Sequence, residues 1–182
     1  MAKPPRNYSP TGWYHVFNRG ARRSDIFLDR HDRSMFLELL ESTTQQGTAE
    51  CHAYALMGNH YHLLLRAEGL DISSAMNWLA SQYVQKFNRR HGIDGPMFRS
   101  RFGSTAILDT EQLLHTVRYI HRNPLDLWQD IEKYEWSSHP AYLGAVPSPS
   151  WLETNTVLAH FTHRAASYRD FIELATPLQQ SA

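Results

Sequence analysis

His60 and His62 are the sharpest chemical feature of this 182-residue chain. The segment 60–66 is typical of a β-strand, and alternate side chains of a strand share a face, so the two imidazoles would point the same way, about 7 Å apart at Cα. Neutral imidazole is a common metal ligand, so the pair could form half of a metal site. Alternatively, one histidine is buried and the other exposed, because a chain with 11 histidines can show this spacing by chance. The apolar run at 63–65 favours the metal site, since it offers neutral histidines few other partners.

Tyr119 is the second feature, because it lies off the apolar face of its predicted helix at 109–123. The apolar residues of that helix that recur at helical spacing are Leu113, Leu114, Val117 and Ile120. Tyr119 lies nearly opposite, in line with His115 four residues before it and Asn123 four residues after it. A tyrosine that packs in a core belongs on the apolar face. Tyr119 is therefore either an ordinary exposed tyrosine or a hydroxyl available for chemistry.

Basic residues between positions 86 and 102 are interleaved with aromatic ones. Arginine binds phosphates with its planar fork and flat rings stack on bases, so this composition is typical of a groove for single-stranded nucleic acid. The alternative is a solvated helix end followed by a turn. Arginines that follow the first predicted strand would extend the groove. The candidate nucleic-acid-binding residues are Arg19, Arg22, Arg23, Lys86, Arg89, Arg90, Phe98, Arg99 and Arg101.

The charges are distributed unevenly although the net charge is zero. Residues 1–125 carry fifteen Lys and Arg against eleven Asp and Glu, whereas residues 126–182 carry three against seven. Fifteen of the 18 basic residues are arginine. A basic part of this kind is consistent with a nucleic-acid partner. The alternative is a solvated surface rich in arginine.

The composition indicates one globular domain, with 42% hydrophobic residues, 20% charged residues and a mean hydropathy of −0.51. No apolar run approaches the roughly 18 residues that a membrane span requires, and the first ten residues lack the apolar stretch of a signal peptide. The single cysteine, Cys51, excludes a disulfide framework and a multi-cysteine zinc site. We therefore expect a cytoplasmic protein with no membrane partner.

The elements that would position these residues alternate between strands and helices. Strands are predicted at 13–19, 50–57, 60–66 and 101–108, and helices at 33–43, 72–91 and 109–123. Asp109 can cap the last helix, and Pro124 ends it. The order predicts an α+β fold with a ferredoxin-like βαββαβ antiparallel sheet, whose first and third strands are central neighbours, and an additional helix that carries Tyr119. The Pro-Ser run at 147–150 predicts a domain at 1–146 and a C-terminal appendage at 147–182.

Five ordered stretches and the opening segment WYHV…NRG carry a resemblance to a known family. The stretches are MGNHYHLLL (57–65), YVQKFNRRHG (83–92), PMFRSRFGS (96–104), YIHRNP (119–124) and YEWSSHPAYLG (134–144). A His-x-His pair alone is a weak signal, but the ordered set is specific and extends over about residues 13–144. The chain resembles the REP-associated tyrosine transposases, a branch of the single-tyrosine HUH transposases.

This resemblance implies that 1–146 is an HUH single-tyrosine transposase domain. It implies that His60 and His62 are metal ligands, with the bulky Tyr61 between them. It also implies that Tyr119 is the nucleophile, which gives the hydroxyl on the polar side of the helix a function.

The third metal ligand in the family is a polar side chain one turn after the tyrosine, which the resemblance places at Asn123. An amide is a poorer ligand than a carboxylate, and Pro124 could draw Asn123 out of helical geometry. His15 on the first strand and His121 are therefore alternatives, although His121 falls on the opposite side of the helix.

The activity that the resemblance implies is cleavage and strand transfer of single-stranded DNA at REP-type hairpins. A divalent ion, Mg²⁺ or Mn²⁺, would polarise the scissile phosphate. The tyrosine would attack it to give a 5′-phosphotyrosine and a 3′-hydroxyl. No water is consumed, so the reverse reaction rejoins strands. The expected partner is single-stranded DNA with REP-type hairpins, bound by a monomer or a homodimer.

Two alternative functions come from other classes. A catalytically inactive protein of the same fold would bind hairpin DNA without cleaving it. A metal-dependent nuclease would use His60 and His62 to activate water and would not need Tyr119. Whichever function holds, one hypothesis for the acidic C-terminal part is that residues 147–182 cover or regulate the DNA groove.

Overall fold

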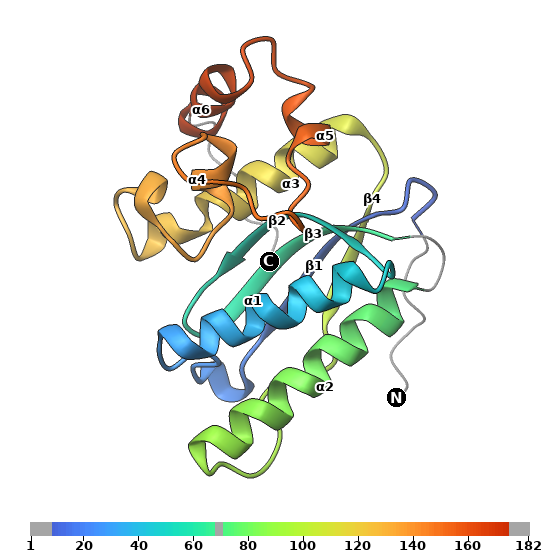
Figure 1. Cartoon of the computed structure of the whole chain (residues 1–182), viewed down its shortest axis with the longest axis vertical. Coiled ribbons are helices and arrows are strands. Elements are labelled where there is room, and N and C mark those ends of the chain that lie inside the picture. Colours follow the sequence, from blue (N-terminus) through green and yellow to red (C-terminus); the bar gives the residue numbers. More distant parts are fainter. Residues whose placement is uncertain (1–8, 68–70, 175–182) are drawn as a thin grey trace.

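Four strands form one antiparallel sheet in the computed structural model, which describes residues 9–67 and 71–174. The strands are β1 (Trp13–Arg19), β2 (Glu50–Leu56), β3 (His60–Arg66) and β4 (Gly103–Ile107). Their order in the sheet is β2-β3-β1-β4, and each neighbouring pair is antiparallel (Figure 1). The first and third strands are therefore central neighbours, and the predicted α+β ferredoxin-like sheet is confirmed.

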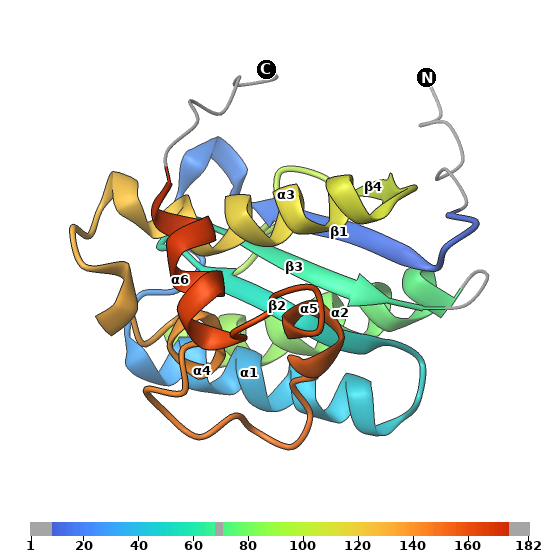
Figure 2. The ribbon, with the colours of Figure 1, turned by 90° about the horizontal axis from the view of Figure 1, so that it is seen from above.

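The long helices lie on both faces of this sheet. Helices α1 (Arg30–Gln45) and α2 (Asp71–His91) cover one face, and α3 (Thr110–Arg122) lies on the other (Figure 2). Shorter elements follow and precede them, namely the 3₁₀ turns η1 (Ala21–Arg23), η2 (Asn123–Asp126) and η3 (Ile131–Lys133), and the helices α4 (His139–Tyr142), α5 (Asn155–Leu158) and α6 (Ala165–Glu173).

The alternation of side chains along the strands divides the interior into two cores. Tyr14 and Val16 of β1 belong to the core beneath α1 and α2. Leu64 of β3 belongs to the core on the opposite face, together with the apolar side of α3. Tyr168 and Ile172 of α6 pack in this second core, so the described part of the C-terminal segment contacts the rest of the chain. The domain boundary at residue 147 stays a prediction.

Helix α3 begins at the cap that the sequence predicts. The side chain of Asp109 accepts a hydrogen bond from the backbone N–H of Gln112 at 2.8 Å, and the side chain of Gln112 accepts one from the N–H of Leu108 at 3.0 Å. The apolar side of α3 is buried, whereas 37% of Tyr119 is exposed. The predicted separation of Tyr119 from the apolar face is therefore found in the structure.

Replacement of Asp109 by alanine should lower the free energy of unfolding by about 1 kcal/mol, because it removes an N-cap and leaves a backbone N–H without its partner. Urea denaturation of the purified variant measures this change. Asp94→Ala, in the exposed loop that follows α2, is the matched control and should leave the unfolding free energy unchanged. Equal midpoints for the two variants would show that the cap does not stabilise α3.

Candidate active site

The two histidines of β3 meet the tyrosine of α3 on one face of the sheet. The ring centroids of His60 and His62 lie 5.2 Å apart. The ring of Tyr119 packs edge-on against His62, with the centroids 5.1 Å apart. The structure therefore brings together the predicted ligand pair and the predicted nucleophile, and the half-exposed tyrosine ring borders the solvent.

Asn123 completes this group from the C-terminal end of α3. Its φ of −53° and ψ of −37° are helical, so Pro124 does not draw it away from the helix axis. The Oδ1 atom of Asn123 lies 3.0 Å from Nε2 of His60. The other ring nitrogen of His60, Nδ1, lies 2.7 Å from Oδ1 of Asn59. A neutral imidazole carries one N–H, so when Nδ1 donates to Asn59, the lone pair of Nε2 faces the oxygen of Asn123. A cation between these two atoms would be bound by both.

His15 of β1 contacts His62, the second histidine of the pair. Its Nε2 atom lies 2.9 Å from Nδ1 of His62, and the two rings stack with their centroids 5.1 Å apart. Asn59 contacts Nδ1 of His60, and His15 contacts Nδ1 of His62. In both histidines Nε2 is therefore the nitrogen whose lone pair could bind an ion. Such bonds fix the orientation of a metal-binding imidazole. The structure thus gives His15 a positioning contact to His62.

His121, the other alternative ligand, lies in the second core. It is fully buried, its Nε2 atom lies 2.6 Å from Oγ of Ser138, and its Nδ1 atom is hydrogen-bonded to the hydroxyl of Tyr168. Two helical residues correspond to a rotation of about 200°, so His121 points away from the side of α3 that carries Tyr119. His121 therefore links α3 to the C-terminal segment and does not reach the site.

Burial keeps the histidines of the site in their neutral form. It lowers the pKa of His15 to about 4, and it is also the main cause that lowers the pKa values of His60 and His62. The neutral form is the one that binds a metal ion. In the part of the chain that the structure describes, no three His, Cys, Asp or Glu side chains are grouped to hold a metal. A site here therefore depends on the amide of Asn123.

Opposing influences act on the pKa of the Tyr119 hydroxyl. Burial raises its pKa above the ordinary value, whereas the positive charge of Arg19 and a hydrogen bond with Asn123 lower it. The phenol is consequently protonated at neutral pH, and it needs local activation before it can act as a nucleophile.

Four of the predicted DNA-binding arginines gather at the end of the sheet where β3 begins. The backbone N–H of Gly20 donates to the carbonyl of Asn59 at 2.9 Å, and the N–H of Arg99 donates to the carbonyl of Arg19 at 3.0 Å. The first bond joins the start of η1 to the turn that precedes His60, and the second joins the loop before β4 to the end of β1. The exposed arginines of this rim, called the arginine rim below, are Arg19, Arg22, Arg23 and Arg99.

The remaining predicted DNA-binding residues lie on adjoining elements. Lys86 and Arg89 are exposed on the last two turns of α2, and Arg101 is exposed just before β4. Phe98 is half-buried, and its ring meets the ring of Tyr61 edge-on with the centroids 6.2 Å apart. Their part in DNA binding stays a prediction.

Arg90 is engaged by two carboxylates of α1 and its cap. Its guanidinium lies 2.5 Å from the carboxylate of Asp29 and 2.5 Å from that of the fully buried Asp32. The same guanidinium holds the pKa of Asp29 at about 2. Arg90 therefore ties the end of α2 to the start of α1, and its predicted phosphate contact would compete with this ion-pair network.

Sequence reasoning did not single out Asn59 or Phe17. Asn59 directly precedes the first candidate ligand, and that position was the available signal for a side chain that orients His60. Phe17 is two residues from His15 on β1 and shares its face, with the ring centroids 5.2 Å apart. Its proximity to the site was readable only once β1 was paired with β3.

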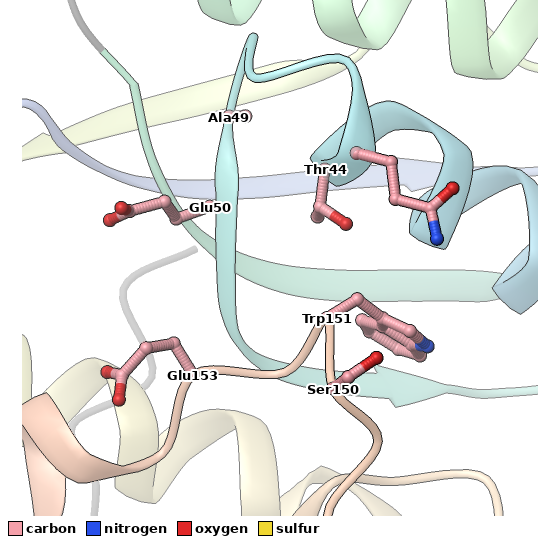
Figure 3. Close-up of a pocket in the computed structure, with 7 residues that line it drawn as sticks. Thr44, Ala49, Glu50, Ser150, Trp151 and Glu153 are labelled. Carbon is pink, nitrogen blue, oxygen red and sulfur yellow. The ribbon is translucent and has the colours of Figure 1, made fainter.

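A pocket of about 310 Å³ lies at the opposite end of the sheet, where β2 begins (Figure 3). None of the predicted site residues contributes to it. Glu50 and Glu153 give it two carboxylates, which disfavour a phosphodiester ligand. The lining residues are Thr44, Gln45, Ala49, Glu50, Ser150, Trp151 and Glu153.

The model of the IS200-like transposase family matches residues 9–123, which contain His60, His62, Tyr119 and Asn123. The chain belongs to the IS200-like transposases. Membership in this family indicates a transposase-like role in DNA processing. Within the described ranges of this IS200-like transposase, no helix is both long and apolar enough to cross a bilayer.

Two solved structures are similar to this IS200-like transposase. One is a REP-associated tyrosine transposase bound to a REP hairpin, with a TM-score of 0.65 and 21% sequence identity, and the match covers 84% of this chain and 92% of that one. The other is a putative transposase from Deinococcus radiodurans, with a TM-score of 0.46 and 17% identity over 66% of this chain and 97% of that one. The first match confirms the fold expected from the resemblance. No similar sequence was found among curated proteins.

Proposed function

We propose that this IS200-like transposase cleaves single-stranded DNA beside REP-type hairpins and transfers the strand through a 5′-phosphotyrosine on Tyr119. One observation carries the proposal, namely that Tyr119 and Asn123 of α3 both meet the histidine pair of β3. The ring of Tyr119 contacts His62, and one helical turn later the Oδ1 atom of Asn123 lies 3.0 Å from Nε2 of His60. The similar REP-associated transposase is bound to a REP hairpin, which supports hairpin DNA as the substrate. All four residues belong to one chain, so a monomer contains the complete group.

His60, His62 and Asn123 would hold the divalent ion. Adjacent ligand atoms of an octahedral ion with bonds of about 2.1 Å lie about 3.0 Å apart. Nε2 of His60 and Oδ1 of Asn123 have this separation. Two imidazoles and one amide oxygen are compatible with Mn²⁺ or Mg²⁺, both of which accept water or phosphate oxygens at their other positions. When bound, the ion supplies positive charge that polarises the scissile phosphate.

Tyr119 supplies the nucleophile in the proposed reaction. Its hydroxyl oxygen forms a bond to phosphorus while the bond from phosphorus to the 3′ oxygen breaks. The phenol releases its proton, and the 3′ oxygen takes up a proton to become a hydroxyl. One phosphodiester replaces another, so the reverse reaction rejoins DNA. Arg19 assists because its charge lowers the pKa of Tyr119 toward the phenolate form.

The arginine rim would position the DNA backbone beside this group. Its guanidinium groups follow the end of β1 and the loop before β4, which border the turn that carries Asn59. Phosphate contacts from such a rim are independent of the base sequence, and each one releases counterions when it forms.

Arg99→Ala should weaken hairpin binding by similar factors for different base sequences. It should also reduce the slope of log K against log salt concentration by about 0.7 to 0.9, the loss expected for one phosphate contact. Fluorescence anisotropy between about 50 and 200 mM salt measures both effects. Arg66→Ala is the matched control, because Arg66 is an exposed arginine at the opposite end of β3 from His60. An unchanged slope in Arg99→Ala would remove this arginine from the DNA interface.

A denaturing gel separates the three candidate functions. The wild-type protein is incubated with labelled hairpin DNA, with Mg²⁺, with Mn²⁺ or with a chelator. A covalent protein–DNA band that requires the ion supports the transposase. Ion-dependent cleavage without a covalent band indicates a nuclease that uses water. Tight hairpin binding in a separate anisotropy measurement, without cleavage under any condition on the gel, indicates a DNA-binding protein that lacks the chemistry.

A further inference from the structure

Phe17 is an exposed aromatic residue at the centre of the sheet. It lies on the central strand β1, and 38% of it is exposed, whereas its neighbour Val16 on the other face is fully buried. Its ring centroid lies 5.2 Å from that of His15 and 6.1 Å from that of His62. Both histidines contact the ring of Tyr119. Phe17 is therefore separated from the candidate nucleophile by a single layer of side chains.

The strand on the other side of Phe17 provides room for its ring. Gly103 of β4 is the residue opposite Phe17 in the antiparallel pair. A Cβ atom at Gly103 would lie 2.5 Å from Cε2 and 2.6 Å from Cζ of the Phe17 ring. No left-handed backbone conformation requires a glycine there. The absent side chain instead allows the ring to lean across β4.

The helix on this face leaves the ring open to the solvent. Helix α3 packs mainly against β2 and β3, so the half of the sheet formed by β1 and β4 keeps an exposed surface around Phe17. An aromatic ring stacks on any base, because every base has a π-face, and this contact suits a single strand held without base pairing. The side chain has no titratable or metal-binding atom, so it can act on the substrate only by contact.

We propose that Phe17 is a stacking platform for the base of a nucleotide that flanks the scissile phosphate. This inference rests on the proposed function, because it requires a DNA strand that passes Tyr119. The rings of His15 and His62 adjoin both Phe17 and Tyr119, so a base on Phe17 belongs to a nucleotide next to the phosphate that Tyr119 attacks. Phe17 is thus a positioning residue, and Gly103 provides the space that its ring occupies.

A cycle that combines protein variants with abasic DNA tests this contact. The substrates are hairpin strands that lack one base at a time on either side of the cleavage site, and anisotropy gives the dissociation constant of each. For the wild-type protein, we expect one flanking abasic position to weaken binding by about 10-fold. Phe17→Ala should weaken binding of the intact strand by a similar factor and lose its sensitivity to that position. Phe17→Trp should restore both the affinity and the sensitivity.

Gly103→Ala is a second variant that leaves the phenylalanine in place. It should displace the ring and show the same loss at the same abasic position. Leu108→Ala is the matched control, because Leu108 is an exposed apolar side chain just beyond β4, and it should retain wild-type sensitivity. Thermal unfolding confirms that each variant is folded.

The stacking contact is overturned if the effects of Phe17→Ala and of every abasic position multiply, or if no flanking abasic position affects the wild-type protein. The covalent band formed by the wild-type protein on the intact strand reports separately on the proposed function. If the covalent band forms but the two effects on binding multiply, the stacking role of Phe17 is rejected and the proposed transposase activity is retained. If the two effects on binding do not multiply but no covalent band forms, the stacking contact is retained and the reaction through Tyr119 is rejected.

Discussion

Tyr119→Phe should abolish formation of the covalent band and reduce cleavage of hairpin DNA by at least about 10³-fold, while the affinity for DNA stays within about twofold. The substitution removes one oxygen atom and keeps the ring that contacts His15 and His62. The side chain is partly exposed, so loss of the hydroxyl leaves no buried polar group without a partner. Single-turnover cleavage on a denaturing gel and anisotropy measure the two quantities.

Tyr54→Phe is the matched control, because it removes a tyrosine hydroxyl from the opposite face of the sheet, where Tyr54 packs near Trp151. It should cleave at the wild-type rate. Cleavage that persists in Tyr119→Phe with unchanged products would contradict the proposed nucleophile and favour a nuclease in which water attacks the phosphate.

His62→Ala should eliminate ion-dependent cleavage and weaken Mn²⁺ binding by at least about 100-fold, since even residues that only orient a metal ligand contribute 10- to 100-fold. The substitution removes one of the two imidazoles that the proposed site offers and also removes the hydrogen bond between His62 and His15. Electron paramagnetic resonance of free Mn²⁺ gives the metal affinity without any reference to DNA cleavage.

His160→Ala is the matched control for this variant, because His160 is an exposed histidine in the turn after α5. It should bind Mn²⁺ and cleave DNA as the wild-type protein does. Equal Mn²⁺ affinity in His62→Ala and the wild-type protein would contradict the proposed ligand set, whatever the effect on cleavage.

The strands were predictable because local signals bound them. Segments 13–19 and 60–66 were predicted with the bounds that β1 and β3 have, since β-forming side chains there end at Gly20 and begin after the Gly58–Asn59 turn. Helix α1 is longer than the predicted 33–43, because Asp29 caps it and accepts a hydrogen bond from the N–H of Asp32 at 3.0 Å. Its first turn is polar, so apolar spacing could not locate it.

The group of side chains around Tyr119 was predictable only in part. The face of β3 that carries His60 and His62 follows from strand geometry, and the polar side of α3 follows from helical spacing. The contact between His15 and His62 depends on the register in which β1 pairs with β3, which no single strand encodes.

Tertiary contacts also decide which candidate residues are engaged elsewhere. His121 bonds to Tyr168, 47 residues further along the chain, and Arg90 bonds to Asp29, 61 residues before it. Neither partner is marked by spacing or composition. The sequence therefore offered His121 as an alternative metal ligand and Arg90 as a phosphate contact, although both side chains have structural partners.

The point of covalent attachment is the measurement that tests the central claim most directly. Wild-type protein is incubated with Mn²⁺ and hairpin DNA labelled at its 3′ end, and the tryptic peptides that carry DNA are identified by mass spectrometry. Trypsin releases Tyr119 in the short peptide 119–122, between Arg118 and Arg122. The predicted result is that this peptide carries the labelled fragment through its 5′-phosphate. Attachment at another residue, attachment of the other DNA fragment, or cleavage without attachment would contradict a transposase that acts through Tyr119.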